Sequence, residues 1–206
     1  MIEIKKLCKS FDKNVIFDNF DITIPKGDFV IFAGDSGCGK TTLLNIIGGL
    51  EPPDGGEVLV DGKNIFQRKN RRAYFMSKVG FLFQNFALVE NKTVRENLLL
   101  VPKRNRTDLT TKEVLEAVGI PEKIDEKVYK LSGGEQQRVA LARLMLKKCD
   151  IILADEPTGS LDSNNAEAVL NILHHMNKQG KTVIVVTHNE KIIKSEKKVV
   201  LLGEKK

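Results

Sequence analysis

Residues 34–41, with the sequence GDSGCGKT, match the pattern G-x-x-x-x-G-K-[ST] of a phosphate-binding loop. They follow a predicted buried strand at 28–33 and precede a segment with helical periodicity. A phosphate-binding loop requires this order of strand, loop and helix, whereas a chance glycine turn does not. The glycines let backbone N–H groups wrap a polyphosphate, and the helix start adds the positive end of its dipole. The residues predicted to bind a nucleotide here are Gly34, Ser36, Gly37, Cys38, Gly39, Lys40, Thr41 and Thr42.

Three side chains of this loop have specific predicted tasks. Lys40 pairs with the β- and γ-phosphates, Thr41 binds Mg²⁺, and Thr42 donates a hydrogen bond to an α-phosphate oxygen. Two adjacent carboxylates, Asp155 and Glu156, end a second apolar run at 151–154. Successive side chains of an extended backbone point in opposite directions, so Asp155 can hold the Mg²⁺ shell while Glu156 serves an attacking water as general base. Ordinary surface charge is the alternative for this pair taken alone.

The segment LSGGEQQ, residues 131–137, is the third chemical signal. Ser132 and Glu135 have the spacing of a capping box, so the simplest interpretation is a helix start. Gly133 and Gly134 are poor helix formers, however, and a helix would not select them for stability. They favour a backbone that an anion can approach closely.

The elements that position these motifs alternate between apolar runs and helical periodicity. Predicted strands lie at 2–7, 20–24, 28–33, 57–60, 79–83, 151–154, 182–186 and 198–202. Predicted helices lie at 40–48, 94–100, 112–118, 133–147 and 164–178, with a short one near Glu190. Apolar, non-alternating strands separated by helices predict an α/β fold with a parallel sheet covered on both faces. The ligand then binds at the carboxyl ends of the strands, where the motifs at 34, 155 and 188 fall.

Bulk properties limit the function classes. The 206 residues fit one domain, and no apolar run approaches the roughly 20 residues of a membrane helix. The N-terminus lacks the apolar core of a signal peptide, so a cytoplasmic location is expected. The net charge of +6 could favour an anionic membrane or nucleic acid, although a solvated surface explains the scattered cations as well.

Cys8, Cys38 and Cys149 are odd in number and irregularly spaced, which predicts neither a disulfide framework nor a metal site. Reduced thiols are the simple interpretation. Because Cys38 lies inside the phosphate loop, redox inhibition is one alternative, and a small residue that the loop tolerates is the other.

Together the motifs resemble the nucleotide-binding subunit of an ATP-binding cassette (ABC) transporter. The six are in family order over essentially the whole chain: 34–41, Gln84, 131–137, Asp155-Glu156, Ser160-Leu161-Asp162 and His188. The resemblance implies a P-loop NTPase core with a mainly parallel sheet flanked by helices, an N-terminal antiparallel β-subdomain and a small inserted helical subdomain. It implies a single domain, 1–206, with 1–90 and 150–206 in the core and 91–149, including LSGGEQQ, in the helical subdomain.

The resemblance also implies roles for individual residues. Gln84 touches Mg²⁺ and the attacking water, His188 contacts the γ-phosphate, and Asp162 crosses between subunits. Phe11 stacks on adenine, where the family more often has Tyr. Without the resemblance these four are a loop glutamine, a structural histidine, a helix cap and a sheet residue. The predicted catalytic set is then Glu156, His188, Gln84 and Lys40, the metal set is Thr41, Gln84 and Asp155, and Ser132, Gly133 and Gly134 join Asp162 in binding ATP.

In the family, the phosphate loop of one subunit faces the LSGGEQQ segment of another across ATP. One copy of each motif predicts a homodimer with two composite sites. The expected partner is an integral membrane permease, with the chain on the inner face of the membrane, no membrane span of its own and no nucleic acid. The segments 80–98 and 154–162 are similar to the branch of macrolide, lipoprotein-release and bacteriocin exporters. A soluble ABC ATPase, or a signalling ATPase that moves no solute, is the alternative.

Overall fold

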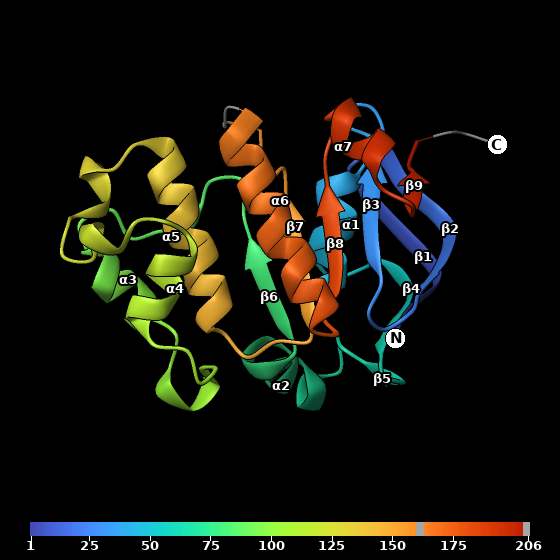
Figure 1. Ribbon diagram of the computed structural model, residues 1–206. Helices are drawn as coiled ribbons and strands as arrows, with labels where there is room; N and C mark the ends of the chain where they lie inside the picture. The colour runs from blue at the N-terminus through green and yellow to red at the C-terminus, as the bar shows by residue number, and fades with distance from the viewer. Residues whose placement is uncertain (160–162, 204–206) are drawn as a thin grey trace.

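A computed structural model describes residues 1–159 and 163–203 of the chain. Figure 1 shows a central sheet with helices on its faces and a second sheet at one side. Every neighbouring pair in the central sheet is parallel, and its strand order is β6-β7-β8-β3-β9. Its strands are β3 (Phe29–Ala33), β6 (Val79–Leu82), β7 (Ile151–Asp155), β8 (Thr182–Val186) and β9 (Val199–Leu201). All their carboxyl ends therefore lie along one edge.

The second sheet is antiparallel and has the order β2-β1-β4-β5. Its strands are β1 (Ile2–Phe11), β2 (Asn14–Ile24), β4 (Gly55–Val60) and β5 (Lys63–Asn64). β1 and β2 are longer than predicted, because bulges interrupt their alternation where Lys6 and Asn19 adopt positive φ angles of 50° and 51°. The two sheets confirm the predicted α/β class with an antiparallel β-subdomain.

The described helices include one that the sequence did not predict. The helices are α1 (Lys40–Ile47), α2 (Arg68–Ser77), α3 (Val94–Leu99), α4 (Thr111–Ala117), α5 (Gly133–Leu146), α6 (Ser163–Lys178) and α7 (Glu190–Ser195). Short 3-10 turns are η1 (Lys103–Asn105), η2 (Pro121–Lys123) and η3 (Val128–Lys130). The first five residues of α2 are basic or amide side chains and only Tyr74 is buried, so the apolar residues of this helix form too short a run to predict it.

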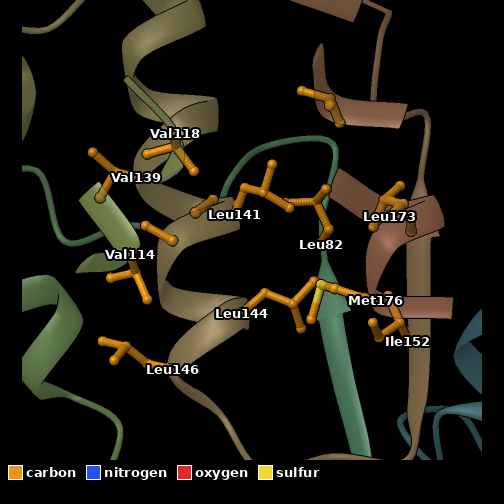
Figure 2. Close-up of a cluster of buried hydrophobic side chains, with 14 of the residues drawn as sticks. Leu82, Val114, Val118, Val139, Leu141, Leu144, Leu146, Ile152, Leu173 and Met176 are labelled. Carbon is orange, nitrogen blue, oxygen red and sulfur yellow. The ribbon is translucent and has the colours of Figure 1, made fainter. Parts of the chain in front are cut away.

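The parallel strands divide their side chains between two cores. Along β7, Ile152 and Ala154 face one cluster while Ile151 and Leu153 face the other. α1 covers the second face, whereas α5 and α6 cover the first. Figure 2 shows this first cluster, in which Leu82 of β6 and Leu141 and Leu144 of α5 lie between α4 and α6. One continuous core therefore links the helical subdomain to the sheet. The boundaries of the helical subdomain at residues 91 and 149 stay a prediction.

We predict that Leu141→Ala lowers the free energy of unfolding by about 2–5 kcal/mol, because Leu141 is fully buried at the centre of this cluster. Urea denaturation monitored by circular dichroism measures the change. Leu109→Ala is the matched control, since Leu109 is 42% exposed and its truncation should cost at most about 0.5 kcal/mol. Equal losses in the two variants would contradict the placement of Leu141.

Candidate functional site

A cleft of about 790 Å³ opens at the carboxyl edge of the parallel sheet. Four strands contribute to it through the segments that follow them: β3 with the glycine loop, β6 with Gln84, β7 with Glu156 and β8 with His188. The predicted site residues that line it are Gly34, Ser36, Gly37, Gly39, Lys40, Thr41, Thr42, Gln84, Glu156 and His188. The fold therefore gathers most of the predicted nucleotide and catalytic residues in one place.

The backbone of the glycine loop needs the absence of side chains at specific positions. Gly34, Gly37 and Gly39 have φ angles of 145°, 83° and 98°, in the region that L side chains rarely adopt. A Cβ on Gly34 would lie 2.3 Å from the Leu202 carbonyl oxygen, and one on Gly39 would lie 2.4 Å from Ile16 Cγ2. Gly39 is also the N-cap of α1 and offers no side-chain cap, so the first helical N–H groups are open to an anion.

Lys40 folds back under this loop. Its Nζ donates hydrogen bonds to the carbonyl oxygens of Gly34 (2.7 Å) and Asp35 (2.6 Å), and the residue is only 8% exposed. The ammonium group is therefore positioned as a fixed positive charge beneath the phosphate cradle.

Thr41 and Asp155 meet across the cleft floor, although they are far apart in sequence. Thr41 Oγ1 donates to Asp155 Oδ1 at 3.2 Å. Burial raises the pKa of the Asp155 carboxyl, and the negative charge of Glu156 raises it further, while the Thr41 bond and Lys40 act in the opposite direction. A hydroxyl and a carboxylate oxygen side by side are the hard ligands that suit Mg²⁺ shared with phosphate oxygens.

Glu156 lies just past the end of β7 and has different hydrogen-bond partners from Asp155, but it does not continue the extended backbone from which its orientation was predicted. Its φ of 45° is left-handed, so a turn and not an extended backbone separates the two carboxylates. Thr187 Oγ1 donates to Glu156 Oε2 at 3.1 Å, and the His188 N–H donates to Oε1 at 3.1 Å. His188 Nδ1 lies 2.6 Å from the same Oε1, which makes His188 a direct partner of the carboxylate. Thr187 was not predicted as a site residue.

The loop after β6 ties Gln84 to the helical subdomain. Phe86 and Ala87 have positive φ angles of 60° and 48°, and their carbonyl oxygens accept hydrogen bonds from Arg143 of α5 at 2.9 and 2.7 Å. Burial lowers the pKa of this guanidinium, which still stays charged. Arg143 was not predicted as a site residue, because an arginine on an amphipathic helix does not by itself indicate a function.

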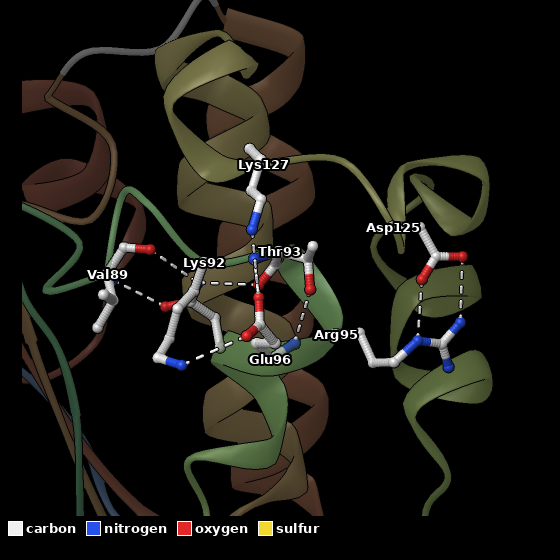
Figure 3. Close-up of polar contacts among 8 residues, drawn as sticks. Val89, Lys92, Thr93, Arg95, Glu96, Asp125 and Lys127 are labelled. Carbon is white, nitrogen blue, oxygen red and sulfur yellow. Dashed lines mark hydrogen bonds and ion pairs between the residues drawn. The ribbon is translucent and has the colours of Figure 1, made fainter.

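The same loop is held again further along, where α3 begins. The buried Asn97 side chain accepts from the Val89 N–H at 2.8 Å and donates to the Val89 carbonyl at 3.0 Å. Figure 3 shows the capping box of Thr93 and Glu96 beside these bonds. The backbone N–H of Thr93 is the main reason why the pKa of Glu96 falls to about 2. The chain between Gln84 and α3 is therefore attached to α5 and α3.

The LSGGEQQ segment does not line the cleft of its own chain. Ser132 caps α5 in a capping box with Glu135, as the simplest sequence interpretation predicted. Gly133 nevertheless has no neighbour within 4 Å of the position of a Cβ, so nothing among residues 1–159 and 163–203 demands a glycine there. The buried Gln137 also donates a hydrogen bond to the Pro157 carbonyl, which links this helix to the segment after Glu156.

Phe11, Cys38 and Asp155 also do not line the cleft, although Asp155 contacts the lining through its hydrogen bond with Thr41. Phe11 ends β1, is 46% exposed and lies below the Lys9 ammonium, 4.9 Å from Nζ to the ring centroid. The Cys38 thiol is half-buried and faces Gly34 and Gly203, while the Cys38 N–H donates to the Asp35 carbonyl at 3.3 Å. Asp162, with Ser160 and Leu161, lies outside the described residues.

A phosphate loop, a buried lysine and a carboxylate pair at the carboxyl edge of a parallel sheet define a P-loop nucleoside-triphosphatase. The profile of the family described as ABC transporter matches residues 17–159. The chain therefore belongs to the ABC transporter family, and it is an ATP-binding cassette with ATPase activity.

Relatives span different transport systems. An uncharacterized ABC transporter ATP-binding protein of Methanocaldococcus jannaschii is 40% identical over 99% of this chain and 96% of its own length. A macrolide export ATP-binding/permease protein of Campylobacter jejuni is 39% identical over 97% of the chain, which spans only 32% of that protein. A methionine import ATP-binding protein of Clostridium acetobutylicum is 42% identical over 94% of the chain and 63% of its own length.

A solved structure resembles the whole described fold. It is the dimeric post-hydrolysis state of an ATP-binding cassette bound to ADP and Pi, with a TM-score of 0.86 and 32% identity over 98% of this chain and 94% of that one. Among residues 1–159 and 163–203, no helix combines the length and apolar character needed to cross a bilayer.

We predict that Asp155→Asn raises the midpoint of urea unfolding at pH 7 without nucleotide or Mg²⁺, because it removes a buried charge beside Glu156 and keeps an acceptor for Thr41. The wild-type Asp155 carboxyl has a pKa above its ordinary 3.8. The ionised carboxylate therefore lowers the free energy of unfolding of the wild type by its full amount above that raised pKa. This destabilisation should shrink as the pH falls through the raised pKa.

Asp150→Asn is the control, because Asp150 forms a surface ion pair with Lys78 at 2.6 Å and its loss should bring no gain. A lower midpoint for Asp155→Asn at pH 7 would contradict the assigned burial cost.

Proposed function

We propose that this chain acts as a homodimer that closes around two ATP molecules and drives a separate membrane permease. The observation that carries the proposal is the separation of the two phosphate-binding elements. The loop 34–41 lines the cleft, whereas Ser132 and Gly133 are exposed outside it, with open space at the Gly133 Cβ position. An isologous pair would bring the α5 start of each subunit to the phosphates held by the other.

In this proposal the residues of the cleft divide the work of phosphoryl transfer. Lys40 and the N–H groups of α1 would hold the phosphates, and Thr41, Asp155 and Gln84 would hold Mg²⁺, which would supply charge neutralisation for phosphoryl transfer. Glu156 accepts the proton of the attacking water, with Thr187 and His188 fixing its two oxygens. His188, 74% exposed in its side chain, is free to turn toward the γ-phosphate.

The permease contact is proposed at an apolar groove of about 290 Å³ beside the Gln84 loop. Phe83, Leu100 and Pro102 line it, together with Arg143. Because Arg143 also holds the carbonyls of Phe86 and Ala87, a permease segment in the groove would act on the chain next to Gln84. Docking there would place the chain at the inner face of the membrane without a span of its own.

The transported substrate is proposed to be exported, and to be a peptide, drug or lipoprotein, from the likeness of residues 80–98 and 154–162 to the exporter branch. The macrolide exporter among the relatives supports this direction, and the methionine importer supports the opposite one. An assay of substrate movement in proteoliposomes with the cognate permease distinguishes them, and ATP hydrolysis without any movement would favour the signalling alternative.

We predict that Glu156→Gln retains ATP binding but slows hydrolysis by about 10²- to 10⁴-fold, because an amide cannot accept the proton of the attacking water. Phosphate release with the permease present measures the rate, and size-exclusion chromatography with ATP should show an accumulated dimer. Glu190→Gln, on the exposed face of α7, should hydrolyse at the wild-type rate. Wild-type turnover in Glu156→Gln would refute the assigned role.

We also predict that Ser132→Arg abolishes hydrolysis while the isolated monomer keeps nearly its full affinity for ATP. The added bulk blocks an approach made by the phosphates of the other subunit. Nucleotide titration of the monomer and phosphate release are the two measurements, with Ser77→Arg at an exposed position of α2 as control. A large loss of ATP affinity in the Ser132→Arg monomer would show that the composite site is wrong.

A further inference from the structure

The charge of this chain is divided unevenly along the sequence. Three segments, 62–89, 97–107 and 136–149, contain thirteen of the 33 Lys and Arg residues and none of the 27 Asp and Glu residues. The rest of the chain therefore carries a net negative charge, although the protein as a whole is +6. A uniformly solvated surface would not concentrate its cations in this way.

The fold brings most of the cations of the three segments, those of α2, η1 and the end of α5, to one edge. α2 leads directly into β6 and residues 147–150 lead into β7, so both lie at the amino ends of the parallel strands, opposite the ATP cleft. Lys147 Nζ donates to the Phe75 carbonyl of α2 at 2.8 Å, and the Lys148 N–H donates to the Asn105 carbonyl of η1 at 2.8 Å. These contacts join α2, the end of α5 and η1 into a continuous surface, which we call the basic edge. Its exposed cations are Lys63, Arg68, Lys69, Arg71, Arg72, Lys103, Arg104 and Lys148.

In the described part of the chain, the exposed cations of the basic edge have no carboxylate partner, unlike the cations of the helical subdomain around α3. In Figure 3, Lys92 and Lys127 both reach Glu96, at 3.4 and 3.7 Å, and Arg95 pairs with Asp125 at 2.9 Å. Within residues 1–159 and 163–203, by contrast, no carboxylate lies within ion-pair distance of any of the eight exposed cations of the basic edge. Asp61 and Asp150, which lie near α2, are both engaged by Lys78.

Apolar side chains accompany these charges. Leu99 and Leu100, at the end of α3 and just before η1, are 45% and 47% exposed. Long basic side chains around exposed leucines suit a flat anionic surface with an apolar layer beneath it. The bases of a single-stranded nucleic acid stack on exposed aromatic rings that lie among cations. The tyrosine of α2, Tyr74, is instead buried, and its hydroxyl is bonded to the Ile47 carbonyl at 2.8 Å.

We infer that the basic edge binds the anionic phospholipid headgroups of a membrane surface. The inference needs neither ATP hydrolysis nor a particular permease, so it goes beyond the proposed function. Lipid contact would hold the cassette at the membrane through its sheet edge and leave the ATP cleft, at the opposite edge, open to a second subunit.

Co-sedimentation of the full chain with vesicles, without nucleotide, tests the inference. The wild type should bind vesicles of phosphatidylcholine mixed with phosphatidylglycerol, should not bind phosphatidylcholine alone, and should dissociate as salt is raised. The triple variant Arg68→Gln/Lys69→Gln/Arg72→Gln should bind the anionic vesicles on the order of 100-fold more weakly, since each cation near such a surface contributes about a factor of five to ten.

The matched control is Lys6→Gln/Lys13→Gln/Lys191→Gln, which removes the same charge from exposed positions outside the basic edge and away from the amino ends of the parallel strands, and should bind like the wild type. Equal losses in the two triple variants would overturn the inference, and so would tighter binding of the wild type to RNA than to anionic vesicles. Binding only to pure phosphatidylcholine vesicles that contain the permease would also overturn it, in favour of a protein partner. ATPase activity, measured in parallel, reports separately on the proposed function.

Discussion

Parallel pairing of β6, β7, β8 and β3 constrains everything else at the cleft. Because the four strands run in the same direction, the segments that follow them emerge at one edge, although they begin at residues 34, 83, 156 and 187 of the chain. Both faces of the sheet are buried, which stabilises it. The polar side chains of the site therefore lie at the edge of the sheet. The hydrogen bonds of Thr41 with Asp155 and of Thr187 with Glu156 join neighbouring parts of that edge.

The cleft is arranged at a cost to stability. Glu156, Phe86 and Ala87 adopt left-handed backbone conformations, each of which costs about 1–3 kcal/mol for a residue other than glycine. Asp155 and Glu156 place two carboxylates close together with one of them buried. Attachments from other elements, such as Arg143 on the carbonyls of Phe86 and Ala87, offset part of this strain. The same attachments connect the cleft to α5, whose first residues are the exposed phosphate-binding candidates.

Several elements and residues escaped sequence reasoning for identifiable physical reasons. The alternation of apolar and polar residues predicted β1 and β2 to be shorter than they are, because bulges shift the register between Ile4 and Lys9. α2 begins with five basic or amide residues and buries only Tyr74, so its apolar run is too short to predict a helix. Arg143 and Thr187 are common residue types whose roles depend on partners more than 30 positions away in the chain. The class of fold, in contrast, was predicted correctly, because apolar strands alternate in the sequence with segments of clear helical periodicity.

The sequence by itself determined the phosphate loop, the carboxylate pair and the family, because local backbone demands require specific residue types at specific spacing. Glycine at 34 and 39 is one such demand, since positive φ angles disfavour L side chains and a Cβ at either position would clash with its neighbours. Only the tertiary structure decided which partners those residues meet, such as His188 and Thr187 on Glu156 and Arg143 on the loop after Gln84. It also decided that the cations of α2, η1 and the end of α5 lie on one edge. Contacts between distant segments depend on strand order and packing, and no local pattern encodes them.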